Sequence, residues 1–333
     1  MASIKDVAAR AGVAPSTVSR VLSNKGYIKE ETAQLVLSAA KELNYRPNFL
    51  AKSLKEGKSQ TIALIVPNLQ KHIYPEIIDG IENVARQKGY SVVLCCTNDD
   101  TALEKEYIQK MQNRWVDGFI LGTAMADSQH ILDLYRSGFP VVLIARHTND
   151  DIDAVAVDNY EAAFMAVEYL IKAGNKKIGI YADWLEVNLF QDRYRGYLDA
   201  MAKHGLPVDP RYVLTGTMDD ESLYFQMKKI IQNYGKPDAM FASSDPKAIV
   251  IIKAILDCGL KIPDDVAVIG FDNIKLSSII TPSLTTVSQP FYKMGEIAMQ
   301  KLCKQIAASE NGEEYVPSID ILDVELIIRK STQ

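Results

Sequence analysis

The stretch SIKDVAARAGVAPSTVSRVL, residues 3–22, decides how the start of this chain folds. Ser3 followed by Asp6 is a capping-box pattern, which predicts that a helix begins here. Gly12 interrupts the apolar spacing, as the tight turn between two crossed helices requires. Pro15 suits the first turn of a second helix, because its missing N–H would have no partner there. The stretch therefore predicts a helix-turn-helix.

The second helix of the pair, residues 15–22, has two different faces. Its inner face is predicted to bury Val18, Val21 and Leu22. Its outer face carries Ser16, Thr17, Ser19 and Arg20. Short hydroxyls and one arginine near the start of a small helix are typical of a helix that reads the major groove of DNA. A third helix, at about residues 29–43, closes a three-helix head.

The charge of the chain is divided unevenly. Residues 1–60 hold seven Lys and three Arg against five acidic residues, which gives a net charge of +5. The whole chain has a net charge of −5, so the remainder carries −10. A small basic head on a large acidic body indicates that the head binds a polyanion, and DNA is the obvious one. The alternative for the head alone is a small helical protein-interaction module.

The bulk composition is that of a soluble globular protein, with 333 residues, 47% hydrophobic and 24% charged. This length favours one small head and two larger lobes. No apolar run approaches the roughly 18–20 residues of a membrane span, and no secretory signal is recognisable, so we expect a cytoplasmic protein without a membrane partner. The four cysteines form no disulfide or metal pattern, which is consistent with reduced thiols.

After residue 60 the pattern changes to alternating strands and helices. A first series has predicted strands at residues 61–66, 90–96, 118–122 and 141–144, and helices at 75–88, 101–113 and 129–137. A second series has helices at residues 160–173, 192–204, 222–234 and 247–257, and strands at 177–181, 213–215, 239–242 and 266–271. Two such series predict an α/β body of two doubly wound parallel-sheet lobes. Ligands bind at the carboxyl ends of parallel strands, so we expect a cleft between the lobes.

The head also carries a longer motif. Residues 4–22 are followed by LNYRPN at 43–48 and AKSLK at 51–55. Together these stretches resemble the head and hinge of the lactose/galactose repressor (LacI/GalR) family. The resemblance implies that residues 47–60 form a hinge helix and linker, and that Leu54 wedges into the minor groove and kinks the duplex. It implies a DNA-binding set of Ser3, Ile4, Pro15, Ser16, Thr17, Ser19, Arg20, Tyr27, Thr32, Asn48, Ala51, Leu54 and Lys55.

Ala14 and Pro15 depart from the family pattern. Ala14 stands where the family commonly has a capping Ser, whose loss costs about 0.5–2 kcal/mol in a typical helix. Pro15 occupies a position where many relatives place a base-reading side chain. Direct readout is therefore expected to depend on Ser16 and Arg20.

The resemblance continues through the body, in VDGFI at 116–120, VDN at 157–159, PDDV at 263–266, IGFDN at 269–273 and PSLTTV at 282–287. It implies a periplasmic-binding-protein-like body, residues 61–333, behind a head of residues 1–46. The chain is expected to cross between lobes near residues 159, 288 and 319. The N-lobe then takes about 61–158 and 289–319, and the C-lobe about 159–288 and 320–333. A homodimer on a palindromic operator is implied, because two heads supply contacts that one lacks.

The same resemblance implies an effector site in the cleft. Its predicted residues are Tyr74, Arg146, Trp184, Arg193, Asp245 and Asp272. Arg193 and Asp272 are the pair on which this prediction mainly rests. Asp245 is equally open to a helix-capping role, Tyr74 to interface packing and Arg146 to a surface ion pair.

The expected effector is a sugar or an anionic sugar derivative. Ala145 stands where many relatives have Asp, so one carboxylate is predicted to be missing from the cleft. Two arginines with one acid fewer favour an anionic ligand, because an arginine fork binds anions well.

Other functions remain as alternatives. Catalysis is not expected, because the phosphate-binding glycine loops and the nucleophile elbow are missing and the histidines lack metal spacing. No cofactor and no metal are expected. A solute-binding protein without DNA function conflicts with the basic head. Control by a phosphorylated carrier protein that docks on the N-lobe is the alternative within the regulator class.

Overall fold

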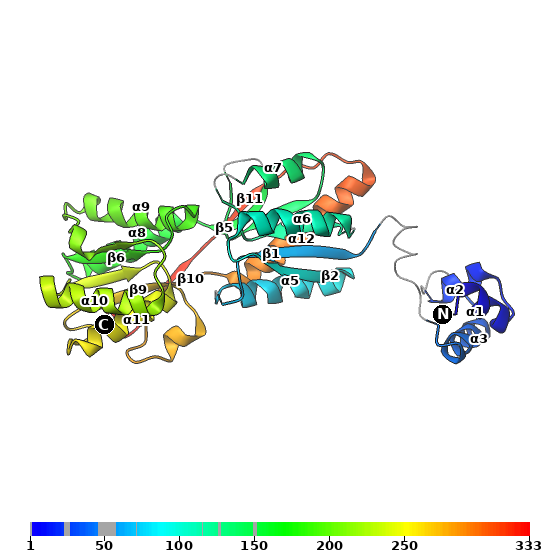
Figure 1. The fold of residues 1–333 in the computed structure, drawn as a ribbon, viewed down its shortest axis with the longest axis horizontal. Coiled ribbons are helices and arrows are strands. Elements are labelled where there is room, and N and C mark those ends of the chain that lie inside the picture. Colours follow the sequence, from blue (N-terminus) through cyan, green and yellow to red (C-terminus); the bar gives the residue numbers. More distant parts are fainter. Residues whose placement is uncertain are drawn as a thin grey trace. The chain divides into compact units, whose positions relative to one another are not determined.

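The computed structural model describes residues 2–22, 27–45, 58–70, 72–114, 116–125, 128–148 and 152–333. It consists of two compact units, a head of residues Met1–Ser59 and a body of residues Gln60–Gln333 (Figure 1). The unit boundary lies within one residue of the predicted end of the linker. Within the described ranges, no helix is both long enough and apolar enough to cross a membrane.

The head contains the three predicted helices, α1 (Ile4–Ala11), α2 (Pro15–Leu22) and α3 (Glu30–Glu42). Gly12 ends α1 with a φ of 66°, a left-handed conformation that glycine adopts without strain. One small core holds the helices together, with Val7, Val18 and Val36 fully buried at its centre. The predicted hinge helix falls within residues 46–57, which lie outside the described residues.

The N-lobe is built on a six-stranded sheet with the order β11-β5-β4-β3-β1-β2. Its strands are β1 (Thr61–Val66), β2 (Ser91–Cys96), β3 (Gly118–Leu121), β4 (Val141–Ile144), β5 (Asp153–Val157) and β11 (Ile319–Leu322). Alternate residues of β1 face opposite layers. Ile62 and Leu64 pack with α5 (Tyr74–Lys88) and α12 (Phe291–Asn311). Ala63 and Ile65 pack with α6 (Thr101–Asn113) and α7 (Gln129–Arg136). The sheet is therefore covered on both faces, as a parallel sheet requires.

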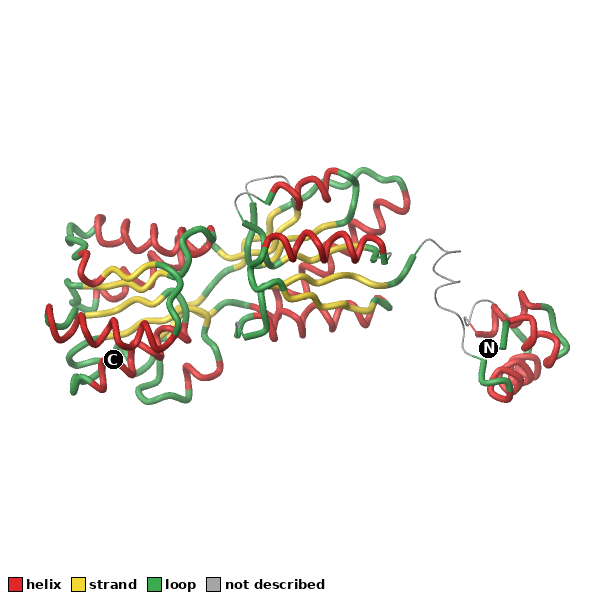
Figure 2. Tube along the Cα trace, in the orientation of Figure 1, coloured by secondary structure: helices red, strands yellow, loops and turns green. Residues whose placement is uncertain are grey.

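The C-lobe repeats this architecture with the strand order β12-β10-β9-β8-β6-β7. Its strands are β6 (Ile178–Ala182), β7 (Val213–Thr215), β8 (Ala239–Ala242), β9 (Ala267–Asp272), β10 (Thr285–Ser288) and β12 (Glu325–Ile327). One face packs against α8 (Asn159–Lys172) and α9 (Asn188–Lys203), the other against α10 (Asp220–Tyr234) and α11 (Asp245–Asp257). Short 3₁₀ turns, η1 (Pro210–Tyr212) and η2 (Lys275–Ser278), complete the lobe. Figure 2 shows the two helix-covered sheets, and the predicted fold class is confirmed.

Within the described part of the body, the chain passes between the lobes at three places. The first two follow β5 and β10, as predicted. The third prediction, near residue 319, is corrected: β11 pairs in parallel with β5, so the N-lobe extends to Leu322 and the crossing is Asp323–Val324. Alternate residues of β11 are exposed, so no continuous apolar run marks this edge strand in the sequence. Val324 packs against the cores of both lobes.

Helices α5 and α12 pack unusually closely, and two glycines permit it. A Cβ atom at Gly80 would collide with the carbonyl oxygen of Tyr292, and one at Gly295 would collide with that of Ile77. Neither glycine has a positive φ, so the requirement here is for space rather than for a special backbone conformation. Gly80 and Gly295 thus determine how closely α12, an element late in the sequence, packs on the N-lobe.

Candidate functional site

Helix α2 presents four of its five predicted DNA-reading residues to solvent. Pro15, Ser16, Ser19 and Arg20 on α2 are exposed, and Thr17 is half-buried. Between them Val18 is fully buried and anchors the helix to the head core. The backbone N–H groups of Thr17 and Val18 donate to the Ala14 carbonyl at 2.9 and 3.2 Å, so α2 starts without a side-chain cap from Ala14. The exposed row can thus enter a DNA groove.

The other predicted DNA contacts lie on different parts of the head. The Ser3 backbone N–H and hydroxyl donate to Asp6 Oδ2 at 2.7 and 2.8 Å, and these two hydrogen bonds hold the pKa of Asp6 below its usual value. Ile4 packs, half-buried, against the head core. Tyr27 is 93% exposed, and Thr32 is half-buried at the start of α3. Asn48, Ala51, Leu54 and Lys55 lie outside the described residues, so their roles remain predictions.

A cavity of about 530 Å³ lies between the two lobes. Four of the six predicted effector residues line it: Tyr74, Arg146, Arg193 and Asp272. Tyr74 and Arg146 come from the N-lobe, and Arg193 and Asp272 come from the C-lobe. The cavity lies where strand ends of the two sheets face each other, the position expected for a ligand in open α/β folds.

Arg193, on α9, is the buried cation of the C-lobe wall. Its Nε donates to Asn159 Oδ1 at 2.9 Å, and its Nη1 donates to the Ser243 carbonyl at 2.6 Å. The guanidinium lies 3.6 Å from the centroid of the Phe271 ring, a cation–π contact. Burial lowers the pKa of Arg193 to about 10, while the neighbouring Asp272 opposes that shift. The side chain is therefore a fixed positive charge at neutral pH.

Asp272, the last residue of β9, is the acid nearest to this arginine. Its φ of 115° is a strained conformation for a residue with a side chain. Gln289 Nε2 donates to its Oδ1 at 2.7 Å, and Arg193 Nη1 lies 3.7 Å away. Burial raises the pKa of Asp272 to about 7, with Arg193 opposing and Asp245 assisting the shift. Near neutral pH this carboxyl can either donate or accept a hydrogen bond to a ligand hydroxyl.

Tyr74 forms an apolar wall of the cavity at the start of α5. Its side chain is 1% exposed, and its hydroxyl donates to the Gly122 carbonyl at 2.8 Å. Burial raises the pKa of this phenol. A Cβ on Gly122 would press against the Tyr74 ring, so the glycine leaves room for it. The ring is held rigidly, and its predicted stacking on a ligand remains a prediction.

Arg146 is buried and is paired with an acid that the sequence did not assign to it. Its Nη1 lies 2.8 Å from Asp99 Oδ1 and donates to the Thr123 carbonyl at 3.3 Å. Asp99, from the loop after β2, thus compensates the charge of Arg146 but does not itself line the cavity. Ala145 itself has a φ of 63°, which turns the chain so that Arg146 reaches inward.

Lys247, a third cation lining the cavity, is paired as well. Its Nζ lies 2.7 Å from Asp220 Oδ1 and donates to the Met218 carbonyl at 2.7 Å. Arg146, Arg193 and Lys247 therefore each face an acid. The cavity wall is rich in charge but internally compensated, which suits a polar ligand without net charge.

Trp184 and Asp245 are not among the residues that line the cavity, so the structure does not bring them together with the other four predicted effector residues. Asp183, one residue before Trp184, lines it instead, and its carboxylate accepts from the Trp184 N–H at 2.9 Å. The buried Asp245 carboxylate accepts from Ile274 N–H at 2.9 Å and from the hydroxyls of Ser277 and Thr286 at 2.6 and 2.5 Å. These hydrogen bonds fix the loop that follows β9 and so help to position Asp272, the last residue of that strand. Burial raises the pKa of Asp245 to about 6.

Several cavity residues were not predicted as site residues. Asn159 orients Arg193 and Gln289 orients Asp272, and both line the cavity. Asn159 ends the family-like stretch at 157–159 and Gln289 follows the one at 282–287 by two residues, and these positions were the available signal. In the described parts of the chain, no three His, Cys, Asp or Glu side chains gather as metal ligands would.

Two family models match the chain. Residues 3–48 match "Bacterial regulatory proteins, lacI family". Residues 59–328 match "Periplasmic binding proteins and sugar binding domain of LacI family". Together the matches include both the exposed α2 row and the interlobe cavity.

Individual relatives match over the full length. The chain is 34% identical over 335 residues to the HTH-type transcriptional repressor PurR of Haemophilus influenzae, covering 100% of this chain and 99% of that protein. A solved complex of the transcriptional regulator CelR with cellobiose is 26% identical, with a TM-score of 0.74, covering 99% of this chain and 100% of that one. The lac repressor dimer bound to operator and the anti-inducer ONPF, at 24% identity and a TM-score of 0.87, covers 99% of both chains and shows the likeness of fold.

Proposed function

The chain belongs to the LacI family of bacterial regulatory proteins and is a DNA-binding transcriptional regulator, and we propose that an uncharged, hydroxyl-rich molecule of sugar size controls it from the interlobe cavity. The proposed role of the cavity is binding, not catalysis. The protein is proposed to act as a repressor in the cytoplasm, where the chromosomal DNA lies.

The observation that carries the proposal is the compensated charge around Arg193 and Asp272. A buried arginine and a buried acid side by side offer a hydroxyl group both a donor and an acceptor. Asp99 and Asp220 compensate the other two cations, so an anionic ligand would compete with carboxylates already in place. This favours a neutral sugar over the anionic sugar derivative that the sequence favoured. The cellobiose bound by CelR is a ligand of this class.

Ligand binding at this place can change the relation between the lobes. Tyr74 and Arg146 belong to one lobe and Arg193 and Asp272 to the other, so a bound molecule contacts both. Gln289, which holds Asp272, lies on the crossing after β10. A ligand that prefers one arrangement of the lobes shifts the population toward it. We propose that this shift alters operator affinity.

We also propose that the protein works as a homodimer on a palindromic operator. Support comes from large apolar side chains that the single chain leaves exposed: Leu94 on the edge strand β2, Phe225 on α10, Leu256 on α11, and Ile279 after η2. Ile279 is 64% exposed and Phe225 57%, which suits residues that become covered on assembly. Two coupled heads raise operator affinity without any new contact in either head.

The test is a thermal-shift and calorimetric screen of the purified protein against neutral mono- and disaccharides, sugar acids, sugar phosphates and nucleobases. A neutral sugar that raises the melting temperature, and does so less in Arg193→Met, supports the proposal. The same sugar should change binding to a duplex selected from a random DNA pool. Binding confined to sugar acids or phosphates would refute the neutral-ligand proposal. No binder in any class would favour control by a carrier protein.

A further inference from the structure

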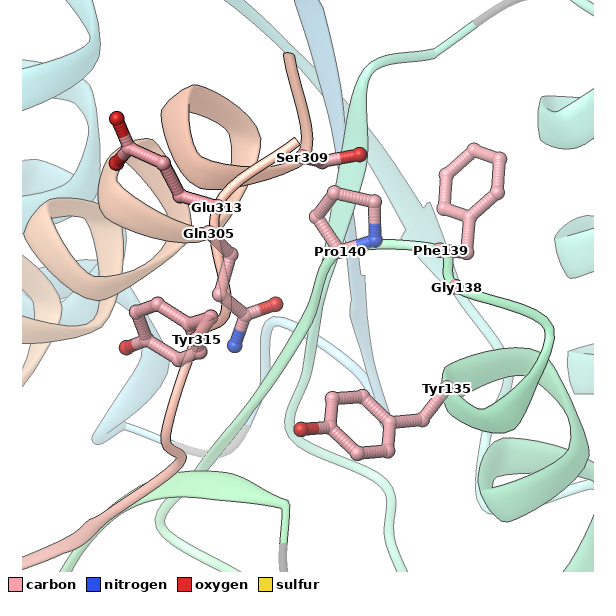
Figure 3. A pocket seen from close by; sticks show the side chains of 8 residues that line it. All are labelled: Tyr135, Gly138, Phe139, Pro140, Gln305, Ser309, Glu313 and Tyr315. Carbon is pink, nitrogen blue, oxygen red and sulfur yellow. The ribbon is translucent and has the colours of Figure 1, made fainter. Parts of the chain in front are cut away.

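The N-lobe holds a second pocket, of about 350 Å³, which shares no lining residue with the interlobe cavity. Tyr135 and Gly138 contribute one wall from the end of α7, and Gln305 and Ser309 contribute the other from the last turns of α12. Figure 3 shows Tyr135 and Tyr315 on opposite sides of the opening, with the amide of Gln305 between them. The pocket thus lies where the C-terminal ends of two helices meet.

The electrostatic surroundings of this pocket favour a cation. The last carbonyl groups of a helix carry a partial negative charge, and both α7 and α12 end at the pocket. Glu313 lies at its rim, and none of the eight lining residues is Lys, Arg or His. Arg136, at the end of α7, is exposed and is not part of the lining. The buried Lys301 behind the pocket is compensated by Asp153 at 3.0 Å and Asp320 at 3.4 Å.

Residues outside the lining hold three of the lining side chains of this pocket in position. The Tyr315 phenol lies near the buried Asp153, burial and this carboxylate together raise the pKa of the phenol, and Phe139 packs on Phe119 with 5.3 Å between ring centroids. Gln305 accepts from the Val141 N–H at 2.8 Å and donates to the Val141 carbonyl at 2.9 Å. A site formed in advance loses little conformational freedom when it binds. Aromatic rings in a negative field are the surroundings that recognise organic cations.

We propose that this pocket binds a small organic cation, an alkylammonium or alkylguanidinium compound, as a second ligand of the protein. The strand β4 begins at Val141, which Gln305 clamps, and is followed by Ala145 and Arg146 in the interlobe cavity. A ligand in the second pocket and an effector in the cavity therefore act on opposite ends of one strand. The pocket does not depend on the identity of the effector.

The test is calorimetric titration of the full-length protein with choline chloride, with butylammonium chloride, and with 3,3-dimethylbutan-1-ol, which has the shape of choline without its charge. Saturable binding of at least one cation is expected, with the alcohol at least about tenfold weaker. Tyr135→Leu should weaken cation binding by about 2- to 30-fold, the range of cation–π contacts, while Tyr135→Phe should retain it.

Matched variants separate this pocket from other sites. Glu313→Gln should weaken binding, and Glu314→Gln, its exposed neighbour outside the lining, should leave it within about twofold. Asp272→Asn, in the interlobe cavity, should leave it unchanged. Melting temperatures establish that each variant is folded. Equal binding of choline and the uncharged alcohol, no saturable binding of either cation, or loss of binding in Asp272→Asn but not in Tyr135→Leu would each overturn the proposal.

Discussion

Arg193 Nη1 and Asp272 Oδ1 lie 3.7 Å apart, close enough for strong attraction but beyond ordinary hydrogen-bond distance. Each is oriented by an uncharged neighbour, Arg193 by Asn159 and Asp272 by Gln289. Both side chains are more than nine-tenths buried. Neighbouring residues therefore hold the pair in place rather than a hydrogen bond between its members, and removing either member deprives the other of its nearest opposite charge.

Removing one member of this pair should cost more than removing both. Arg193→Met is expected to lower the free energy of unfolding by about 3 kcal/mol at pH 8, because it leaves Asp272 buried and uncompensated. Arg193→Met combined with Asp272→Asn should recover a clear part of this loss. Urea unfolding of the two single variants and the double variant measures the coupling. Losses that simply add would show that the two charges do not interact energetically.

The stability of the protein should fall with rising pH through the titration of Asp272. Its pKa is raised to about 7 in the folded state, so the folded chain keeps a proton that the unfolded chain has lost above about pH 4. This contribution to stability is fully present below about pH 4 and disappears as pH rises to about 7. The Asp272→Asn variant lacks this pH-dependent contribution. The melting temperature of the variant minus that of the wild type should therefore increase between pH 5 and pH 8. A difference that stays constant over this range would contradict the assignment.

Gly80→Ala should destabilise the N-lobe by steric overlap. The added methyl group meets the Tyr292 carbonyl, so α5 and α12 must move apart, at a cost of about 1–3 kcal/mol. Gly312→Ala is the matched control, because Gly312 ends α12 with a φ of 66° but has open space around it. The control should cost only the backbone strain, about 1 kcal/mol. Thermal unfolding compares the two, and a smaller loss for Gly80→Ala would show that the helices can separate freely.

Arg20→Ala should weaken operator binding by about 5- to 150-fold, the loss of 1–3 kcal/mol typical of an arginine that contacts a base. Arg10→Ala is the control, since Arg10 lies on α1, outside the predicted DNA-binding set, and is paired with Glu42 at 2.7 Å. Fluorescence anisotropy with the selected duplex, at several salt concentrations, separates base reading from phosphate contact. Equal effects of both substitutions would place Arg20 outside the readout surface.

The sequence predicted those parts of the fold that repeat a strong local pattern. Apolar runs such as residues 61–66 and the capping box at Ser3 correspond to β1 and α1. The long helix α12 was not among the predicted elements, and neither were β5, β10, β11 and β12. Strand β11 is an edge strand with exposed alternate residues, and β12 has three residues, so neither has a marked hydrophobic signal.

The candidate site was predictable residue by residue, but its pairings were not. Arg193 and Asp272 stood out because each belongs to a recognisable stretch, and the structure places them together. Asp99 could not be associated with Arg146, because their meeting depends on left-handed φ angles at Asp99 and Ala145, which single residue types do not reveal. The sequence also could not show that Asp245 lies outside the cavity lining. Only the folded loop after β9 shows that its carboxylate oxygens already accept hydrogen bonds from that loop.

The interruption of the N-lobe by the C-lobe has a consequence for synthesis on the ribosome. Helix α12 and strand β11, residues 291–322, complete the N-lobe only after the greater part of the C-lobe has been made. The head, by contrast, is complete within the first 45 residues. A nascent chain therefore displays the groove-reading helix α2 long before it has a lobe able to sense a ligand, and chains that terminate early would carry this helix without its control.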